Sequence, residues 1–434
     1  MPTFKSIKSL FILSLPIIAG QIGQMLIGTG DVYIAGLYST KTVGAIGVAN
    51  GLINPIFLFG IGLMMGISPV LAIDSSKNKD TQKSLSSILI YSFIVGIVLS
   101  LITFIFTFFI DLFPLEPALI PSIKTYIQIV TWSFPFAYLY QAIKEYLQAR
   151  EEVFWPNLLS LIAVVVNVGV NAFLVFGYGS FQGVGEIGLA YASFIIRVLL
   201  FISVLFLVRN ELKLEFNLKL IKRVFRFSLP VAFMFFLEVL AFCSVSVLSG
   251  FFSVVAAAAN NIIMTIASIV FMIPLSISSA VAVRVGNAFG AHDKNKLLQN
   301  AMSAIFISFL FTLASAISFT LFPESIIRVF THDKSVIALG VRLMGVVALF
   351  QLFDGLQVTL TGILRGMERT KLSSIVVFIG YWILGIPFGL LMAYYFDMRV
   401  YGLWIGLAVS LALVAIILSG SFRYVYTKFD QTAH

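Results

Sequence analysis

Long apolar stretches alternate with short polar connections along the whole chain, and this pattern predicts helices that cross a membrane. A membrane-spanning helix needs about 20 mostly apolar residues, because each residue adds about 1.5 Å and the hydrocarbon core is about 30 Å thick. Measured in this way, the sequence predicts twelve spans: 10–37, 44–73, 85–111, 121–148, 155–178, 187–208, 224–249, 254–283, 298–322, 336–364, 372–396 and 400–427. Because the number is even, both termini are expected on the same side of the membrane.

The composition supports this class of protein. Of the 434 residues, 60% are hydrophobic and only 11% are charged, whereas soluble domains carry about 25% charged residues. So few charges cannot cover the surface of soluble domains, which excludes a soluble enzyme and a disordered chain. Cys243 is the single cysteine, so no disulfide can form within the chain. The first apolar stretch continues past Pro16 without a cleavage site, so no signal peptide is expected.

The basic residues indicate the orientation in the membrane. Of the 28 basic residues, 21 lie at the termini or in the connections on the same side as the termini. The positive-inside rule assigns that side to the cytoplasm. We therefore expect a multi-pass protein of the inner (plasma) membrane with cytoplasmic N- and C-termini. The net charge of +9 then reflects topology and not binding to nucleic acid.

The two halves of the chain resemble each other. At a shift of 214 or 215 residues, Ser14-Leu15-Pro16 matches Ser228-Leu229-Pro230, and Arg150 matches Arg365. Each half has an even number of spans, so the repeats are parallel, as in many transporters. The predicted fold is an all-α polytopic membrane protein, with twelve transmembrane helices in two parallel six-helix lobes around a central cavity. The expected units are an N-terminal lobe at 1–208, a cytoplasmic linker at 209–223 and a C-terminal lobe at 224–434.

Three acidic residues, Asp31, Glu238 and Asp354, lie well inside predicted spans. A charged carboxylate at mid-membrane costs at least about 2.5–3.5 kcal/mol, so each one is a candidate functional group. The structural alternative is an ion pair between helices, but Arg197 is the single basic residue deep in a span. At least two of the acids must therefore be protonated, hydrated or bound to a cation. Oxygen ligands suit Na⁺, and a carboxyl group kept neutral by burial suits a proton.

Other polar and bent positions are weaker candidates. Asn167 and Asn171 share one face of a helix, and amides in such helices either join neighbouring helices or serve as ligands. Pro16 and Pro230, at matching repeat positions, remove a helical hydrogen bond and are candidate hinges. Glu145 is expected to be an interfacial charge that reaches water.

A cavity for flat aromatic cations needs aromatic, thioether or amide side chains. The candidates for this lining are Gln24, Met25, Met264, Phe350 and Gln351. For any single aromatic residue or methionine, a place in the protein core or against lipid is the commoner alternative.

The segment Arg284–Ala291 closely resembles the Arg-Val-Gly-Asn-x-x-Gly-Ala segment of the multidrug and toxic compound extrusion (MATE) family. Three further features agree with it: Gly28–Asp31 closing the first span, Leu229-Pro230 ahead of Glu238, and Asp354 followed by Leu364–Gly366. The resemblance covers the whole chain and is to the NorM-like branch. It implies secondary active export of bulky, mostly cationic and aromatic compounds, by antiport with Na⁺ or H⁺ through alternating access.

The resemblance also implies roles for individual residues. Glu238 and Asp354 correspond to a cation site in the C-terminal lobe, where bound Na⁺ is the one metal ion expected. Asp31, Asn167 and Asn171 correspond to a site for a proton, cation or substrate in the N-terminal lobe. Many NorM-like members have Tyr one turn before the second acid of the cation site, where this chain has Phe350.

Three alternatives remain. A flippase or exporter of a lipid-linked or anionic substrate, from the same superfamily, would need a basic cavity. Here the predicted spans contain three acids and one basic residue, Arg197. A major-facilitator transporter would carry a basic Gly/Asp/Arg motif that is absent from residues 74–80. A membrane-embedded enzyme would need a catalytic constellation, and the three histidines have no metal-like spacing. We expect no enzyme activity, no cofactor besides the coupling ion, and no obligate protein or nucleic-acid partner.

Overall fold

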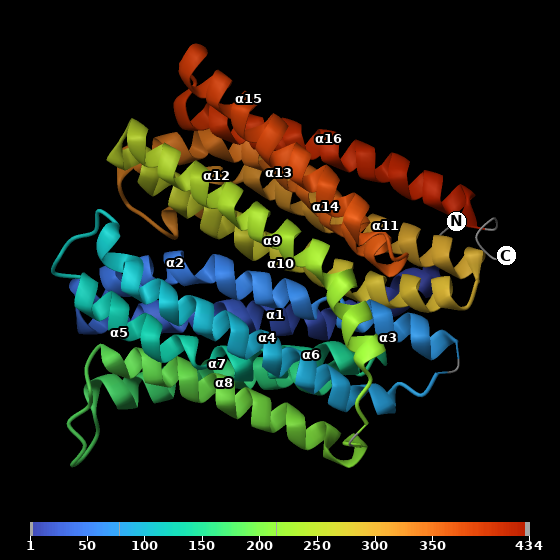
Figure 1. Ribbon diagram of the computed structural model, residues 1–434. Helices are drawn as coiled ribbons and strands as arrows, with labels where there is room; N and C mark the ends of the chain where they lie inside the picture. Colours follow the sequence, from blue (N-terminus) through green and yellow to red (C-terminus); the bar gives the residue numbers. More distant parts are fainter. Residues whose placement is uncertain (1–2, 78, 214, 430–434) are drawn as a thin grey trace. The chain divides into compact units, whose positions relative to one another are not determined.

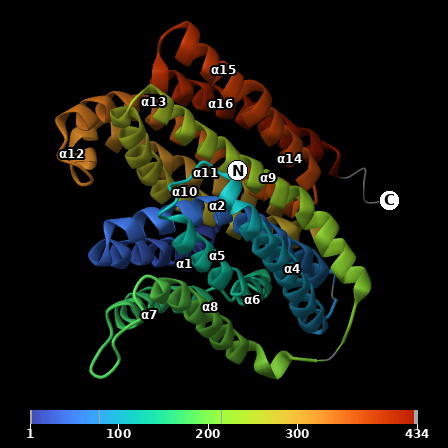
Figure 2. The same ribbon diagram turned by 60° about the vertical axis from the view of Figure 1, so that its left-hand side comes forward.

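The computed structural model describes residues 3–77, 79–213 and 215–429, and it is helical (Figures 1 and 2). Within these residues, eleven helices are long and apolar enough to cross a membrane, which confirms the predicted class of protein. The α-helices are α1 Phe4–Tyr38, α2 Thr40–Met64, α3 Ile67–Ser76, α4 Leu85–Phe106, α5 Ile120–Thr131, α6 Phe134–Ala149, α7 Phe154–Phe176, α8 Ile187–Val208, α9 Leu218–Phe252, α10 Val254–Gly290, α11 Lys294–Leu321, α12 Pro323–Arg328, α13 Lys334–Gly366, α14 Thr370–Phe378, α15 Ile386–Leu390 and α16 Arg399–Thr427. Short 3₁₀ helices are η1 Gln82–Ser84, η2 Thr107–Leu112 and η3 Arg209–Glu211, and π-helices are η4 Ile379–Gly385 and η5 Leu391–Tyr395.

The predicted span 121–148 is formed by two shorter helices, α5 and α6, with a break at Trp132 and Ser133. Pro135 has no N–H, so it cannot donate to the carbonyl oxygen of Thr131 one turn earlier. The hydroxyl of Ser100 donates to that oxygen instead, at 2.8 Å. The break therefore leaves no carbonyl without a partner at Thr131.

The chain forms two compact units, and each consists mainly of one half of the sequence. Each unit also includes the first part of one helix, α1 or α9, whose remainder belongs to the other unit. Unit 1 consists of Met1–Ile18 and Phe233–His434, and unit 2 of Ala19–Ala232. The sequence placed the division in the connection 209–223, whereas the contacts place the boundaries inside α1 and α9. Each boundary follows two residues after a proline, Pro16 or Pro230. The two boundaries are thus related by the same shift as the sequence repeat.

The start of α1 belongs to unit 1 because its side chains pair with α10 and α11. The guanidinium of Arg284 donates to the hydroxyl of Ser9 at 2.8 Å. The ring of Phe11 stacks on that of Phe311, with centroids 6.1 Å apart. Polar and aromatic contacts thus fix the first turns of α1 within unit 1.

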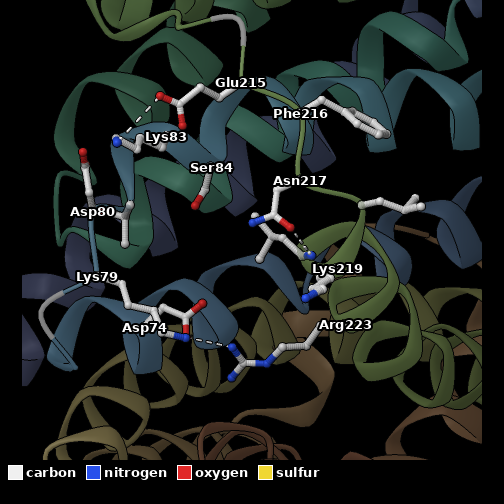
Figure 3. Close-up of a pocket in the computed structure, with 13 residues that line it drawn as sticks. Asp74, Lys79, Asp80, Lys83, Ser84, Glu215, Phe216, Asn217, Lys219 and Arg223 are labelled. Atoms are coloured by element: carbon white, nitrogen blue, oxygen red, sulfur yellow. Dashed lines mark hydrogen bonds and ion pairs between the residues drawn. The ribbon is translucent and has the colours of Figure 1, made fainter.

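The start of α9 belongs to unit 2 for a corresponding reason. Asp74, at the end of α3, forms ion pairs with Arg223 at 2.7 Å and with Lys79 at 3.0 Å, and Figure 3 shows the Arg223 side chain extending toward Asp74 along a pocket. A Cβ atom on Gly62 would lie 2.6 Å from the Cα of Ala232. Glycine at position 62 therefore allows α2 and α9 to approach closely.

Packing within each unit places particular helices around the candidate acids. In unit 1, α13 packs against α10, α11 and α16, so Asp354 on α13 lies deep inside the unit. In unit 2, α7 packs along α8, and both views show these two helices side by side (Figures 1 and 2). Asn167 and Asn171 on α7 are fully buried within this unit.

The predicted span 372–396 contains two π-helical segments, η4 and η5, on either side of α15. Pro387 in α15 cannot donate to the carbonyl oxygen one turn earlier, so the α-helical pattern is interrupted here. π-Helical turns are often found at functional sites, and η4 contains Tyr381 and Trp382.

Candidate functional site

Asp31 on α1 is the centre of a hydrogen-bonded site in unit 2. Asn167 and Asn171 each donate from their amide nitrogen to Oδ1 of Asp31, at 3.0 and 2.7 Å. Ser193 on α8 donates from its hydroxyl to Oδ2 at 2.9 Å. Asp31 is 5% exposed, and both asparagines are fully buried. The structure thus brings together all three residues of the predicted N-terminal site.

The same site has unused acceptors, and Asp31 forms no ion pair with the residues that the structure describes. The amide oxygens of Asn167 and Asn171 are buried and have no hydrogen-bond partner among the described residues. Arg197 interacts with Asp31 electrostatically but without an ion pair. Its guanidinium donates to Ser133 at 2.7 Å and lies 4.6 Å from the ring centroid of Phe57. The buried carboxylate is therefore stabilised by neutral donors.

Glu238 on α9 and Asp354 on α13 form the corresponding site of unit 1. Glu238 is 6% exposed and Asp354 2%, and the two carboxyl groups interact electrostatically. Tyr381 in η4 donates its hydroxyl to Oε1 of Glu238 at 3.1 Å. The indole nitrogen of Trp382 donates to the carbonyl oxygen of Leu237 at 3.0 Å, which joins η4 to α9.

Asp354 is a buried acid with an oxygen that no donor in the described part of the chain reaches. Its buried Oδ1 atom has no donor there, and neither polar atom of the buried Gln351 amide has a partner. Within the same ranges, no three His, Cys, Asp or Glu side chains gather into a metal-binding cluster. Two carboxylates, together with oxygens of Asp354 and Gln351 that accept no hydrogen bond from the described residues, suit a single monovalent cation bound by oxygen.

Phe350 and Gln351, two of the residues that the sequence predicts to line a cavity, are both buried on α13. Phe350 is 2% exposed, and its ring packs edge-on against Trp404 and Phe242 at centroid distances of 5.2 and 6.0 Å. Gln351 is fully buried. The burial of both side chains follows from the position of α13 inside unit 1. The other predicted lining residues, Gln24, Met25 and Met264, are half-buried on their helices.

Glu145 is also buried, so its interpretation as an interfacial charge is wrong. It is 3% exposed and accepts hydrogen bonds from Ser68 and from Gln141, the latter at 3.1 Å. Its neighbour Lys144 is equally buried, and the ammonium group has no hydrogen-bond partner among the described residues. The hydrogen bond from Ser68 joins Glu145 on α6 to α3.

Sequence reasoning missed two residues that bind the candidate acids. Ser193 lies one turn before Arg197, so the polar spacing on α8 was a usable signal. Tyr381 supplies a phenol to the unit 1 site, although the position one turn before Asp354 holds Phe350. The sequence indicated Tyr381 less clearly, because the position of its phenol depends on the π-helical turns that accompany Pro387.

Comparison with known proteins identifies the family. The sequence profile of the MatE family matches residues 16–173 and 230–391, so the chain belongs to the MatE family. It is 30% identical over 436 residues to the probable multidrug resistance protein NorM of Mesorhizobium japonicum, covering 95% of this chain and 93% of the relative. It is 27% identical to the multidrug resistance protein NorM of Photobacterium profundum, covering 98% and 96%.

A solved structure shows the same fold. The crystal structure of the eukaryotic MATE transporter AtDTX14 matches with a TM-score of 0.88 at 20% identity, over 99% of this chain and 98% of the other. These relations confirm the resemblance to NorM-like members of the MATE family that the sequence motifs predicted.

Proposed function

We propose that the protein is a secondary active transporter that exports bulky, mostly cationic and aromatic compounds in exchange for H⁺ or Na⁺. Membership of the MatE family and similarity to proteins named for multidrug resistance support the transport function. The observation that carries the coupling proposal is the burial of Asp31, Glu238 and Asp354 without an ion pair in the described residues. An ionised carboxylate buried at membrane depth costs free energy, and binding of a proton or a cation removes this cost.

The two sites take different roles in this proposal. Asp31 already accepts hydrogen bonds on both oxygens, so it binds a proton, which needs no further ligands. Among the described residues, Glu238 and Asp354 have one donor between them, and one oxygen of Asp354 has none. They therefore bind a monovalent cation, Na⁺ or H⁺, that supplies the missing positive charge. A cationic cargo competes with the coupling ion for these carboxylates. Binding of the ion therefore favours release of the cargo.

The exchange follows from alternating access between the two halves of the repeat. The cytoplasmic orientation of the termini rests on the positive-inside rule. Pro16 and Pro230 mark where α1 and α9 pass from one compact unit to the other, which supports their role as hinges. One charge moving across the membrane contributes about 2.3 kcal/mol per 100 mV, more than a tenfold change in cargo affinity.

The experiment is efflux from proteoliposomes loaded with a cationic aromatic dye. We expect an imposed proton or Na⁺ gradient to accelerate efflux, and an ionophore that collapses the gradient to abolish the acceleration. Efflux that ignores both gradients would refute antiport. Movement of an anionic lipid-linked sugar analogue, with no movement of the dye, would favour the flippase alternative.

A further inference from the structure

A small cavity in unit 2 lies close to the Asp31 site and is not explained by it. The cavity has a volume of 120 Å³ and lies between the first turns of α2 and α5 and the start of α8. Its polar lining consists of Thr42, Ser122, Thr125, Tyr126 and Glu186. It lies at the end of unit 2 that carries the α1–α2 turn and the α7–α8 connection, which the positive-inside rule assigns to the outer face.

Glu186 is a half-buried carboxylate at this cavity. It accepts hydrogen bonds from the hydroxyls of Ser122, at 2.6 Å, and Thr42, at 3.3 Å. It forms no ion pair with the residues that the structure describes. The preceding connection is ordered, since the amide of Gly185 donates to the carbonyl of Val175 at 3.3 Å. The fold thus holds an unpaired carboxylate in a fixed place.

Tyr126 joins the cavity to Asp31. It lines the cavity and is 6% exposed. Its phenol group lies close enough to Ser193, Asn50 and Asp31 to interact with each of them. Ser193 in turn donates to Asp31 at 2.9 Å. A phenol and a hydroxyl therefore connect the inner wall of the cavity to the buried acid.

The spacing on α8 gives the length of this path. Glu186 precedes Ser193 by seven residues and Arg197 by eleven, which places all three on one face of the helix. Seven residues along a helix correspond to about 10 Å, too far for a direct hydrogen bond. The cavity has both Glu186 and Tyr126 in its lining, and its volume of 120 Å³ has room for several water molecules, each of which needs about 10–15 Å³.

The other charged or titratable groups around Glu186 are few. They are Tyr126 in the cavity, Tyr38 against Gly185, Lys41 next to Thr42, and Lys124 on α5, which is paired with Asp111 at 2.6 Å. None of them forms an ion pair with Glu186 in the described ranges. Glu186 is thus the acidic group of the cavity and its natural proton acceptor.

We propose that this cavity is the outer entrance for protons to Asp31, with Glu186 as the first acceptor. A proton from the outer solution binds the Glu186 carboxylate and passes through water in the cavity to the oxygen of Tyr126. Tyr126 gives its own hydroxyl proton to Ser193, and Ser193 gives its proton to Oδ2 of Asp31. One proton enters and one arrives, with every intermediate group restored. The path rests on the proposed function of Asp31.

The chemistry of the path fits a proton better than Na⁺. A sodium ion needs several oxygen ligands at each position along its way. Here the inner wall is a buried phenol, followed by a single hydroxyl. Protons cross such a series by exchange of hydrogen bonds, whereas an ion would have to displace the ring of Tyr126.

The test separates the rate of proton transfer from the number of protons bound. Purified full-length protein in weakly buffered detergent is mixed rapidly with a cationic aromatic dye, and a pH indicator follows proton release. We expect Glu186→Gln to slow the release about tenfold with an unchanged amplitude. Positioned proton-transfer groups contribute about 10²–10⁴-fold, and cavity water replaces part of this. Tyr126→Phe should give the same result.

The matched control is Glu116→Gln, because Glu116 is an exposed carboxylate in the connection before α5 at the same end of unit 2. It should leave both rate and amplitude unchanged. Wild-type rates in both Glu186→Gln and Tyr126→Phe would overturn the path, and so would a reduced amplitude in Glu186→Gln. An unchanged amplitude in Asp31→Asn would instead refute the proposed function of Asp31, so the two failures are distinguishable.

Discussion

The two candidate sites differ in the balance between carboxylates and hydrogen-bond donors. In unit 2, one carboxylate, Asp31, accepts from three neutral side chains. In unit 1, the phenol of Tyr381 donates to Glu238, and within the described residues Asp354 has an oxygen with no donor. The first arrangement stabilises a lone ionised acid that a proton can neutralise. The second leaves two buried negative charges, which a bound cation would neutralise.

The largest effect is expected from Asp354→Asn. An amide keeps the volume of the side chain but removes the charge that no donor satisfies, so we expect ion-driven dye efflux to fall to background while the protein stays folded. The measurement is efflux under an imposed gradient, with the monodispersity of the purified variant as a check on folding. Robust ion-driven efflux from this variant would remove Asp354 from the site. Asp397→Asn, whose side chain is 82% exposed, is the control.

Glu238→Gln should have the next largest effect. It leaves Asp354 as the one remaining carboxylate of the Glu238–Asp354 pair, so we expect half-saturation of transport to need about 10–100-fold more cation, equivalent to about 1.4–2.8 kcal/mol. The measurement is dye efflux against Na⁺ concentration and against proton concentration in separate series. Unchanged responses to both ions would contradict the assignment.

Asn171→Leu tests the donors of unit 2. It removes the shortest hydrogen bond to Asp31, at 2.7 Å, and so destabilises the ionised carboxylate that forms when the proton leaves. A hydrogen bond to a charged group contributes about 1.5–3 kcal/mol, so we expect proton-driven efflux to fall about tenfold. Asn157→Leu is not a suitable control because Asn157 packs against Gly20. Asn261→Leu, at an exposed position of α10, should have no effect.

Tyr381→Phe should give the smallest change. The variant keeps the ring and removes the single donor to Glu238, and we expect a two- to fivefold weaker cation dependence, about 0.5–1 kcal/mol. The measurement is the same cation titration of efflux as for Glu238→Gln. Tyr395→Phe, at a side chain that is 78% exposed, controls for loss of a phenol. A loss as large as that of Glu238→Gln would mean that the phenol, and not the carboxylate, dominates the site.

The sequence predicted the helical membrane fold well because apolar length alone determines where spans form. It also predicted that Asp31 lies with Asn167 and Asn171, since the resemblance paired them and the spacing placed both amides on one face. The unit boundaries were not predictable, because they depend on contacts such as Arg284 with Ser9 that join residues far apart in the chain. The burial of Phe350 and the donor Tyr381 likewise depend on the packing of α13 and on the π-helical turns of η4.

The number of protons that cargo displaces from the purified protein tests most directly whether Asp31 carries the exchanged proton. Addition of a saturating cationic aromatic dye in weakly buffered solution should release protons from the wild-type protein. We predict that Asp31→Asn releases about one proton fewer per molecule, because a single carboxyl group is removed from the exchange. Equal release from the wild type and from Asp31→Asn would contradict the claim that Asp31 carries the exchanged proton.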